Sequence, residues 1–105
     1  MSPRQRTAED IASFQGLGAA VVTLRERAGI SSAELAEKIG VRESDMERIE
    51  RGEVDADWAT LRFLARELKL PLDVLIELAE ERAPGEGGEQ WRRWSREAER
   101  ERDVG

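Results

Sequence analysis

The polar side chains with the clearest chemistry lie in the stretch 43–51. On a helix, with about 100° between successive residues, Met46 and Ile49 fall on one side of this stretch. The opposite side carries Ser44, Glu47, Arg48 and Arg51. Arginine pairs bidentately with guanine, serine hydrogen bonds to several bases, and glutamate accepts from cytosine. The spacing therefore indicates a helix face suited to reading base edges in a DNA groove, without covalent chemistry.

The same stretch also fits a surface that binds no DNA. Glu43 and Asp45 project sideways in the first turn of the expected helix, where acidic groups stabilise the helix dipole by about 0.3–1 kcal/mol. Arg48 and Arg51 fit surface ion pairs, which contribute little to stability. Glu43 is a further candidate DNA contact in the base-reading interpretation. The alternative is a solvated or partner-binding face.

Two short helices would position this face. Each has its own apolar stripe, and Gly40 between them supplies a turn that other residues enter only with strain. The stripes consist of Leu35, Ala36 and Ile39, and of Val41, Met46 and Ile49. Ser31 with Glu34 predicts a capping box that opens the first helix, and Gly52 suits the end of the second. Such a pair is typical of a helix-turn-helix unit, whose second helix enters a DNA major groove.

A longer helix is expected before this unit. Thr7 with Asp10 approximates a capping box, so the helix should begin near Ala8. Its apolar face would consist of Ile11, Phe14, Leu17, Val21, Leu24 and Ala28. Gly16 and Gly18 each destabilise its middle by roughly 1 kcal/mol relative to alanine, which favours a break there.

Two more helices are expected after the unit. Asp57 should cap the fourth helix, and Pro71 suits the first turn of the fifth. The inward residues of the fourth would be Trp58, Leu61, Leu64, Ala65 and Leu68, with Trp58 in the core or at the domain edge. Those of the fifth would be Leu72, Leu75, Ile76 and Ala79. No β-pattern is apparent, so the predicted fold class is all-α.

Several motifs, in order along the chain, resemble a known family. They are LG at Leu17, LRERAGIS from Leu24, AELAEKIGV from Ala33, IERGE from Ile49 and LRFLARELKLPLDVLIEL from Leu61. From Leu17 to Glu81 the chain resembles the phage-repressor, Cro-like (XRE-type) helix-turn-helix family. The resemblance implies a five-helix, lambda-repressor-like domain that binds double-stranded DNA. It also implies a sequence-specific transcriptional regulator that occupies an operator as a homodimer, with recognition helices about 34 Å apart.

The resemblance extends to residues around the third helix. Ser32 stands where members commonly carry glutamine, and its hydroxyl and the helix N-terminus can hold a phosphate. Arg42 stands at the cap of the third helix, where Ser or Thr is common. Arginine in place of a capping residue lowers helix stability by about 1 kcal/mol. The same substitution puts a cation at the groove entrance. Arg25 and Glu50 occupy the positions of an ion pair that would orient the third helix.

The charge of the chain argues against tight DNA binding. It has 17 Lys and Arg against 23 Asp and Glu, a net charge of −6, and residues 19–82 hold ten basic and fifteen acidic residues. The loop 52–57 is acidic where the family is often basic, whereas proteins that bind DNA usually present a basic footprint. The second hypothesis is therefore an interaction module on the same fold, antitoxin-like or binding a protein partner through its acidic surface or its tail.

Missing residue types exclude several functions. Without cysteine or histidine, disulfides and thiolate or imidazole metal sites are impossible. Catalysis would rest on carboxylates and lysines, and the GEGG segment lacks the strand and Lys-Ser/Thr partner of a nucleotide loop, so neither an enzyme nor a cofactor is expected. No apolar run approaches the ~20 residues that span a membrane, and no signal peptide appears, which predicts a cytoplasmic protein.

The chain divides into four predicted segments. Residues 1–16 form an arm and the start of the first helix, 17–82 the domain, 83–88 a Gly-rich linker and 89–105 a charged tail. Arg4 and Arg6 resemble basic arms that reach into a minor groove, with simple disorder as the alternative. Trp91 and Trp94 predict a helical stripe that docks on the domain or on a second subunit, again against disorder.

Overall fold

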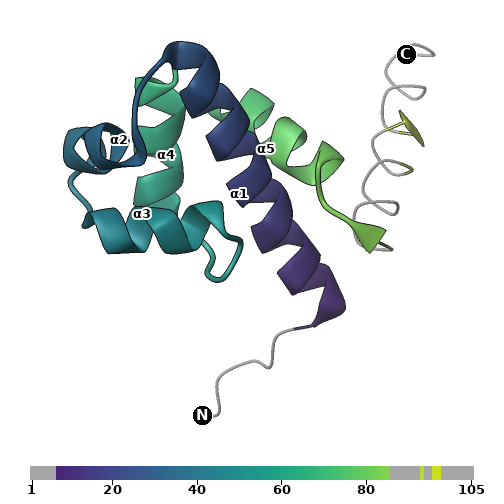
Figure 1. Cartoon of the computed structure of the whole chain (residues 1–105). Coiled ribbons are helices and arrows are strands. Elements are labelled where there is room, and N and C mark those ends of the chain that lie inside the picture. The colour runs from purple at the N-terminus through teal and green to yellow at the C-terminus, as the bar shows by residue number, and fades with distance from the viewer. Residues whose placement is uncertain (1–6, 86–92, 94–95, 98–105) are drawn as a thin grey trace.

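A computed structural model describes residues 7–85, together with 93, 96 and 97. The described part contains five helices and no strand. They are α1 (Ala8–Ala28), α2 (Ser32–Ile39), α3 (Glu43–Glu50), α4 (Trp58–Glu67) and α5 (Leu72–Glu81). The predicted all-α class and the order of five helices are therefore confirmed. In Figure 1 α1 runs diagonally through the domain, with α2, α3 and α4 on one side and α5 on the other.

Side-chain caps set where α1, α2 and α4 begin, whereas the N-caps of α3 and α5 make no side-chain cap bond. The Thr7 backbone N–H donates to Asp10 Oδ2 at 3.0 Å, and the Asp10 backbone N–H donates to Thr7 Oγ1 at 3.1 Å, so α1 opens on the predicted capping box. Asp57 Oδ1 accepts from the Thr60 backbone N–H at 2.8 Å, which confirms the expected cap of α4. Pro71 is the N-cap of α5, one position before the predicted first turn. Local sequence alone thus determines most of the helix starts.

The core draws on all five helices. Its most completely buried large side chains are Val21, Leu35, Met46, Leu64 and Leu75, one from each helix. Because each short helix buries only one stripe, α2 and α3 keep their positions by packing against each other, with α1 also contacting α3 and α4 contacting α2. No helix among the described residues has the length and apolar character needed to cross a membrane.

The predicted break at Gly16 and Gly18 is wrong, because α1 is continuous over 21 residues. Both glycines are buried where another backbone crosses α1. A Cβ at Gly16 would collide with the Ala79 carbonyl oxygen of α5, and one at Gly18 would lie 2.6 Å from the Ile49 carbonyl oxygen of α3. Tertiary packing outweighs the low helix propensity of glycine here, since only a residue without Cβ permits this approach.

Three residues predicted on inward faces are exposed, namely Ile11 and Ala28 of α1 and Trp58 of α4. Trp58 is 63% exposed and Ile11 is 45% exposed, so of the two predicted positions of Trp58 the core is excluded and the domain edge agrees with the structure. Ile11 and Trp58 lie in the first turn of their helices, and Ala28 is the last residue of α1. Trp58 also lies at the edge of its stripe, roughly 70° from the stripe centre at 100° per residue.

The packed part of the chain extends beyond α5. Ala83, which the sequence assigns to the linker, is 3% exposed and lies against Gly16 of α1. The described domain therefore includes at least Ala83. The predicted arm arginines Arg4 and Arg6, and the tail tryptophans Trp91 and Trp94, lie outside the described residues.

Candidate nucleic-acid interface

Helices α2 and α3 form the predicted helix-turn-helix unit. Gly40 ends α2 in the left-handed region, at φ 78° and ψ 28°, and the Val41 backbone N–H donates back to the Ala36 carbonyl at 3.0 Å. The left-handed conformation of Gly40 and this hydrogen bond turn the chain within residues 40–42, before α3 begins at Glu43. The buried residues of the two helices are Leu35, Ala36 and Ile39, and Met46 and Ile49. The opposite face of α3 is therefore left for solvent or a partner.

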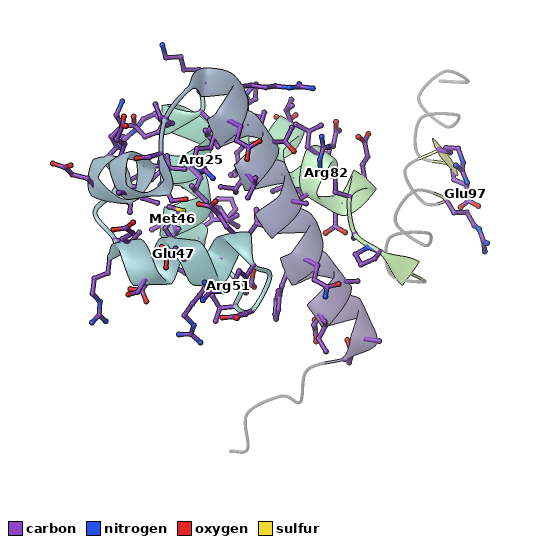
Figure 2. All side chains as sticks on the ribbon, in the orientation of Figure 1. Arg25, Met46, Glu47, Arg51, Arg82 and Glu97 are labelled. Carbon is purple, nitrogen blue, oxygen red and sulfur yellow. The ribbon has the colours of Figure 1, made fainter. Side chains whose placement is uncertain are left out.

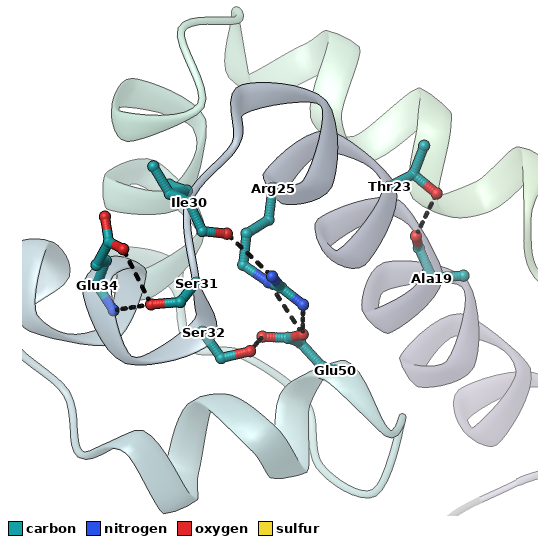
Figure 3. Close-up of polar contacts among 8 residues, drawn as sticks. All are labelled: Ala19, Thr23, Arg25, Ile30, Ser31, Ser32, Glu34 and Glu50. Carbon is teal, nitrogen blue, oxygen red and sulfur yellow. Dashed lines mark hydrogen bonds and ion pairs between the residues drawn. The ribbon is translucent and has the colours of Figure 1, made fainter.

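An ion pair between Arg25 and Glu50 ties α3 to α1 (Figure 3). Arg25 Nη2 and Nε donate to Glu50 Oε1 at 2.9 and 3.2 Å, and Arg25 Nη1 donates to the Ile30 carbonyl at 3.0 Å. The side chains are only 15% and 9% exposed. This confirms the pair that the family resemblance implied. Because a nearly buried pair with this many hydrogen bonds has few alternative geometries, it fixes the orientation of α3.

Ser32 joins the Arg25–Glu50 pair and completes a polar cluster of three side chains. The sequence did not indicate this contact of Ser32. Its hydroxyl donates to Glu50 Oε2 at 2.7 Å, so the second carboxylate oxygen is also satisfied (Figure 3). The only hydroxyl hydrogen of Ser32 is therefore committed inward. What remains for the predicted phosphate contact is the backbone N–H of the first turn of α2. Ser32 and Glu50 are 18 residues apart, so local sequence patterns did not indicate their contact. The predicted Arg25–Glu50 pair could have indicated it.

The predicted face of α3 is exposed as a unit. All four of its residues, Ser44, Glu47, Arg48 and Arg51, are exposed, and Arg42 and Glu43 beside them are exposed as well. In Figure 2 Glu47 and Arg51 lie on the outer side of α3, whereas Met46 points into the domain. The helical periodicity thus placed these side chains correctly, and their contact with DNA stays a prediction.

Arg42 is the N-cap of α3 and makes no side-chain cap bond, in accord with the expected loss of the cap. Instead its guanidinium Nε lies 3.3 Å from Asp45 Oδ2. The Arg42 side chain is 86% exposed, so this pair is weak and leaves the cation accessible at the start of α3.

The two arginines of the predicted face, Arg48 and Arg51, share the carboxylate of Glu53. Arg51 Nε and Nη2 donate to Glu53 Oε1 and Oε2 at 3.1 and 3.3 Å, and Arg48 Nε lies 3.7 Å from Glu53 Oε2. The hydrogen bond from Arg51 lowers the pKa of Glu53, and the same bond raises the pKa of Arg51. The acidic loop therefore folds back toward the face that was predicted to bind DNA. The sequence shows that this loop is acidic, but it did not indicate that the loop contacts Arg48 and Arg51.

Comparison with known proteins agrees with this geometry. A family model described as a helix-turn-helix domain matches residues 16–78, which is more than half of the 105-residue chain. Two crystal structures of the clp gene regulator ClgR from Corynebacterium glutamicum are similar at 25% identity, with TM-scores of 0.61 and 0.60. Each similarity covers 64% of this chain, and 71% and 87% of the respective ClgR chains. No curated protein matches the sequence. The match over residues 16–78 means that the chain belongs to the helix-turn-helix domain family.

Proposed function

We propose that the chain is a sequence-specific DNA-binding transcriptional regulator that acts by occupying an operator, without catalysis. The observation that carries the proposal is the exposed polar face of α3, held in a fixed orientation by the Arg25–Glu50 pair. A helix presented in this way by a helix-turn-helix unit fits a major groove. Membership of the family supports the proposal, as does the similarity to ClgR, a protein described as a gene regulator.

The residues of the interface have different proposed roles. Ser44, Glu47 and Arg48 face base edges, with Glu43 at the side of the groove. Arg42 and Arg51, at the two ends of α3, contact phosphates, and the first turn of α2 at Ser32 contacts another phosphate through its backbone. These roles follow from the positions of the residues along α3.

The proposed regulator is a cytoplasmic homodimer of the Cro-like, XRE type. Two symmetric copies would place their α3 helices in successive major grooves, about 34 Å apart, on a palindromic operator. Sedimentation at micromolar concentration measures the mass directly. A protein that is monomeric in solution and binds a palindromic operator as a single protomer would contradict this part of the proposal.

Selection of bound sequences from a random duplex library tests the proposed function. The expected result is a palindrome whose half-sites are one helical turn apart, about 10–10.5 bp centre to centre. Recovery of random sequences would mean that the protein binds DNA without sequence preference. Absence of binding at about 50 mM salt, where phosphate contacts are strong, would contradict DNA binding altogether.

The second candidate function is an interaction module, antitoxin-like or partner-binding, that docks a basic protein. The observation in its favour is that the arginines of α3 already pair with carboxylates, in a chain with a net charge of −6. Under this alternative the acidic loop 52–57 or the tail supplies the binding surface, and the α3 arginines are structural. A protein that binds no DNA in the selection but captures a basic partner would support it.

A further inference from the structure

The Glu53 carboxylate occupies the site where the guanidinium groups of Arg48 and Arg51 come together. Both of its oxygens accept from Arg51, and Oε2 also lies 3.7 Å from Arg48 Nε. A bidentate arginine–carboxylate contact has the geometry that arginine uses for phosphate and for the guanine edge. The two arginines therefore hold an anion from their own chain in the folded protein.

The backbone of α3 holds Glu53 in this place. Gly52 follows the last turn of α3 in the left-handed region, at φ 73°, and turns the chain back toward the helix. The Glu53 backbone N–H then donates to the Arg48 carbonyl at 3.0 Å. Glu53 is thus part of the C-terminal cap of α3, and its carboxylate starts from a fixed point beside the two arginines.

A neighbouring acid of the same loop makes a different contact. Asp55 Oδ1 accepts from the Ala56 backbone N–H at 2.9 Å. It has the same charge as Glu53 and is exposed like it. Comparing the two residues therefore separates an effect of charge in the loop from an effect of the specific contact with Arg48 and Arg51.

We infer that Glu53 is an internal competitor for DNA, which must displace its carboxylate before Arg48 and Arg51 can bind phosphate or base. This inference rests on the proposed function and adds a residue that sets affinity. In the complex the displaced carboxylate lies beside the DNA and takes up a cation. That uptake offsets part of the counterion release, so it makes the salt dependence of binding shallower.

The test compares the full-length protein with its Glu53→Gln and Asp55→Asn variants. Glutamine removes the charge and keeps the shape, and each variant removes one negative charge from the loop. Fluorescence anisotropy with a random-sequence 24-bp duplex measures affinity between 50 and 200 mM salt. We expect Glu53→Gln to bind about three- to tenfold more tightly at 50 mM salt, because two exposed ion pairs no longer have to break. Its slope of log affinity against log salt should be steeper by about 0.9.

Asp55→Asn should change the affinity less than about twofold, because its carboxylate does not contact the two arginines. The gain from Glu53→Gln should also disappear when Arg48 and Arg51 are both replaced by alanine.

Equal gains from Glu53→Gln and Asp55→Asn would overturn the inference in favour of a general charge effect. Weaker binding by Glu53→Gln would overturn it too, because Glu53 would then position the arginines for DNA. If the unaltered protein and every variant fail to bind both this duplex and the selected library, the proposed function fails and the inference falls with it.

Discussion

At the scale of single residues, the polar cluster of Arg25, Ser32 and Glu50 decides how α3 is presented. Three side chains from three helices satisfy one another, and no buried side-chain nitrogen or oxygen in the described residues lacks a partner. A cluster of this kind is sensitive to the loss of any member, because a buried charge without its partner is costly. The orientation of the proposed reading face therefore depends on residues that do not face DNA.

Arg25→Ala tests this dependence. We expect it to lower the free energy of unfolding by about 3 kcal/mol, because the Glu50 carboxyl group would stay in a nearly buried site without its partner guanidinium. Urea denaturation measures the change. Arg27→Ala is the matched control, since Arg27 is an exposed arginine of the same helix turn and should change stability by less than about 0.5 kcal/mol. Equal effects of the two substitutions would show that the pair contributes only as a surface contact.

At the scale of helices, the sequence was informative where local rules determine structure. The caps at Thr7 and Asp57 and the turn at Gly40 depend on residues only a few positions apart, and all three were predicted correctly. The burial of Gly16 and the exposure of Trp58 depend instead on where other helices lie, which local periodicity cannot specify. The contact of Glu53 with α3 belongs to the same class, because it depends on the direction of the chain after Gly52.

Gly16→Ala tests whether helix packing or helix propensity dominates in α1. Propensity alone predicts a gain of about 1 kcal/mol, whereas the collision of the new Cβ with the Ala79 carbonyl predicts a net loss of about 1–3 kcal/mol. We expect the loss, measured by thermal or urea unfolding. Ala19→Gly, at an exposed position of the same helix, calibrates the propensity effect and should cost about 1 kcal/mol. Stabilisation by Gly16→Ala would mean that α1 and α5 can separate without cost.

At the scale of the whole molecule, an acidic chain would bind a polyanion through a small cationic surface. The described α3 region offers Arg42, Arg48 and Arg51, while the net charge of the chain is −6. We expect a modest slope of log affinity against log salt, roughly −3 to −4 per protomer, if three or four phosphates are neutralised. Titration at several salt concentrations measures it. A slope near −8 per protomer would mean that cations outside this region, such as those of the arm or the tail, dominate binding.

The most direct test of the reading face compares Arg48→Ala with Arg51→Ala on two DNAs, the selected operator and a random duplex of equal length. The quantity measured is the ratio of the two affinities for each variant. Arg48→Ala should reduce this ratio by about tenfold, because a bidentate base contact provides about 1–3 kcal/mol of discrimination. Arg51→Ala should weaken binding to both duplexes alike and leave the ratio unchanged, as loss of a phosphate contact does. Identical effects of the two substitutions, or an unchanged ratio in both, would contradict the proposal that the outer face of α3 reads DNA sequence.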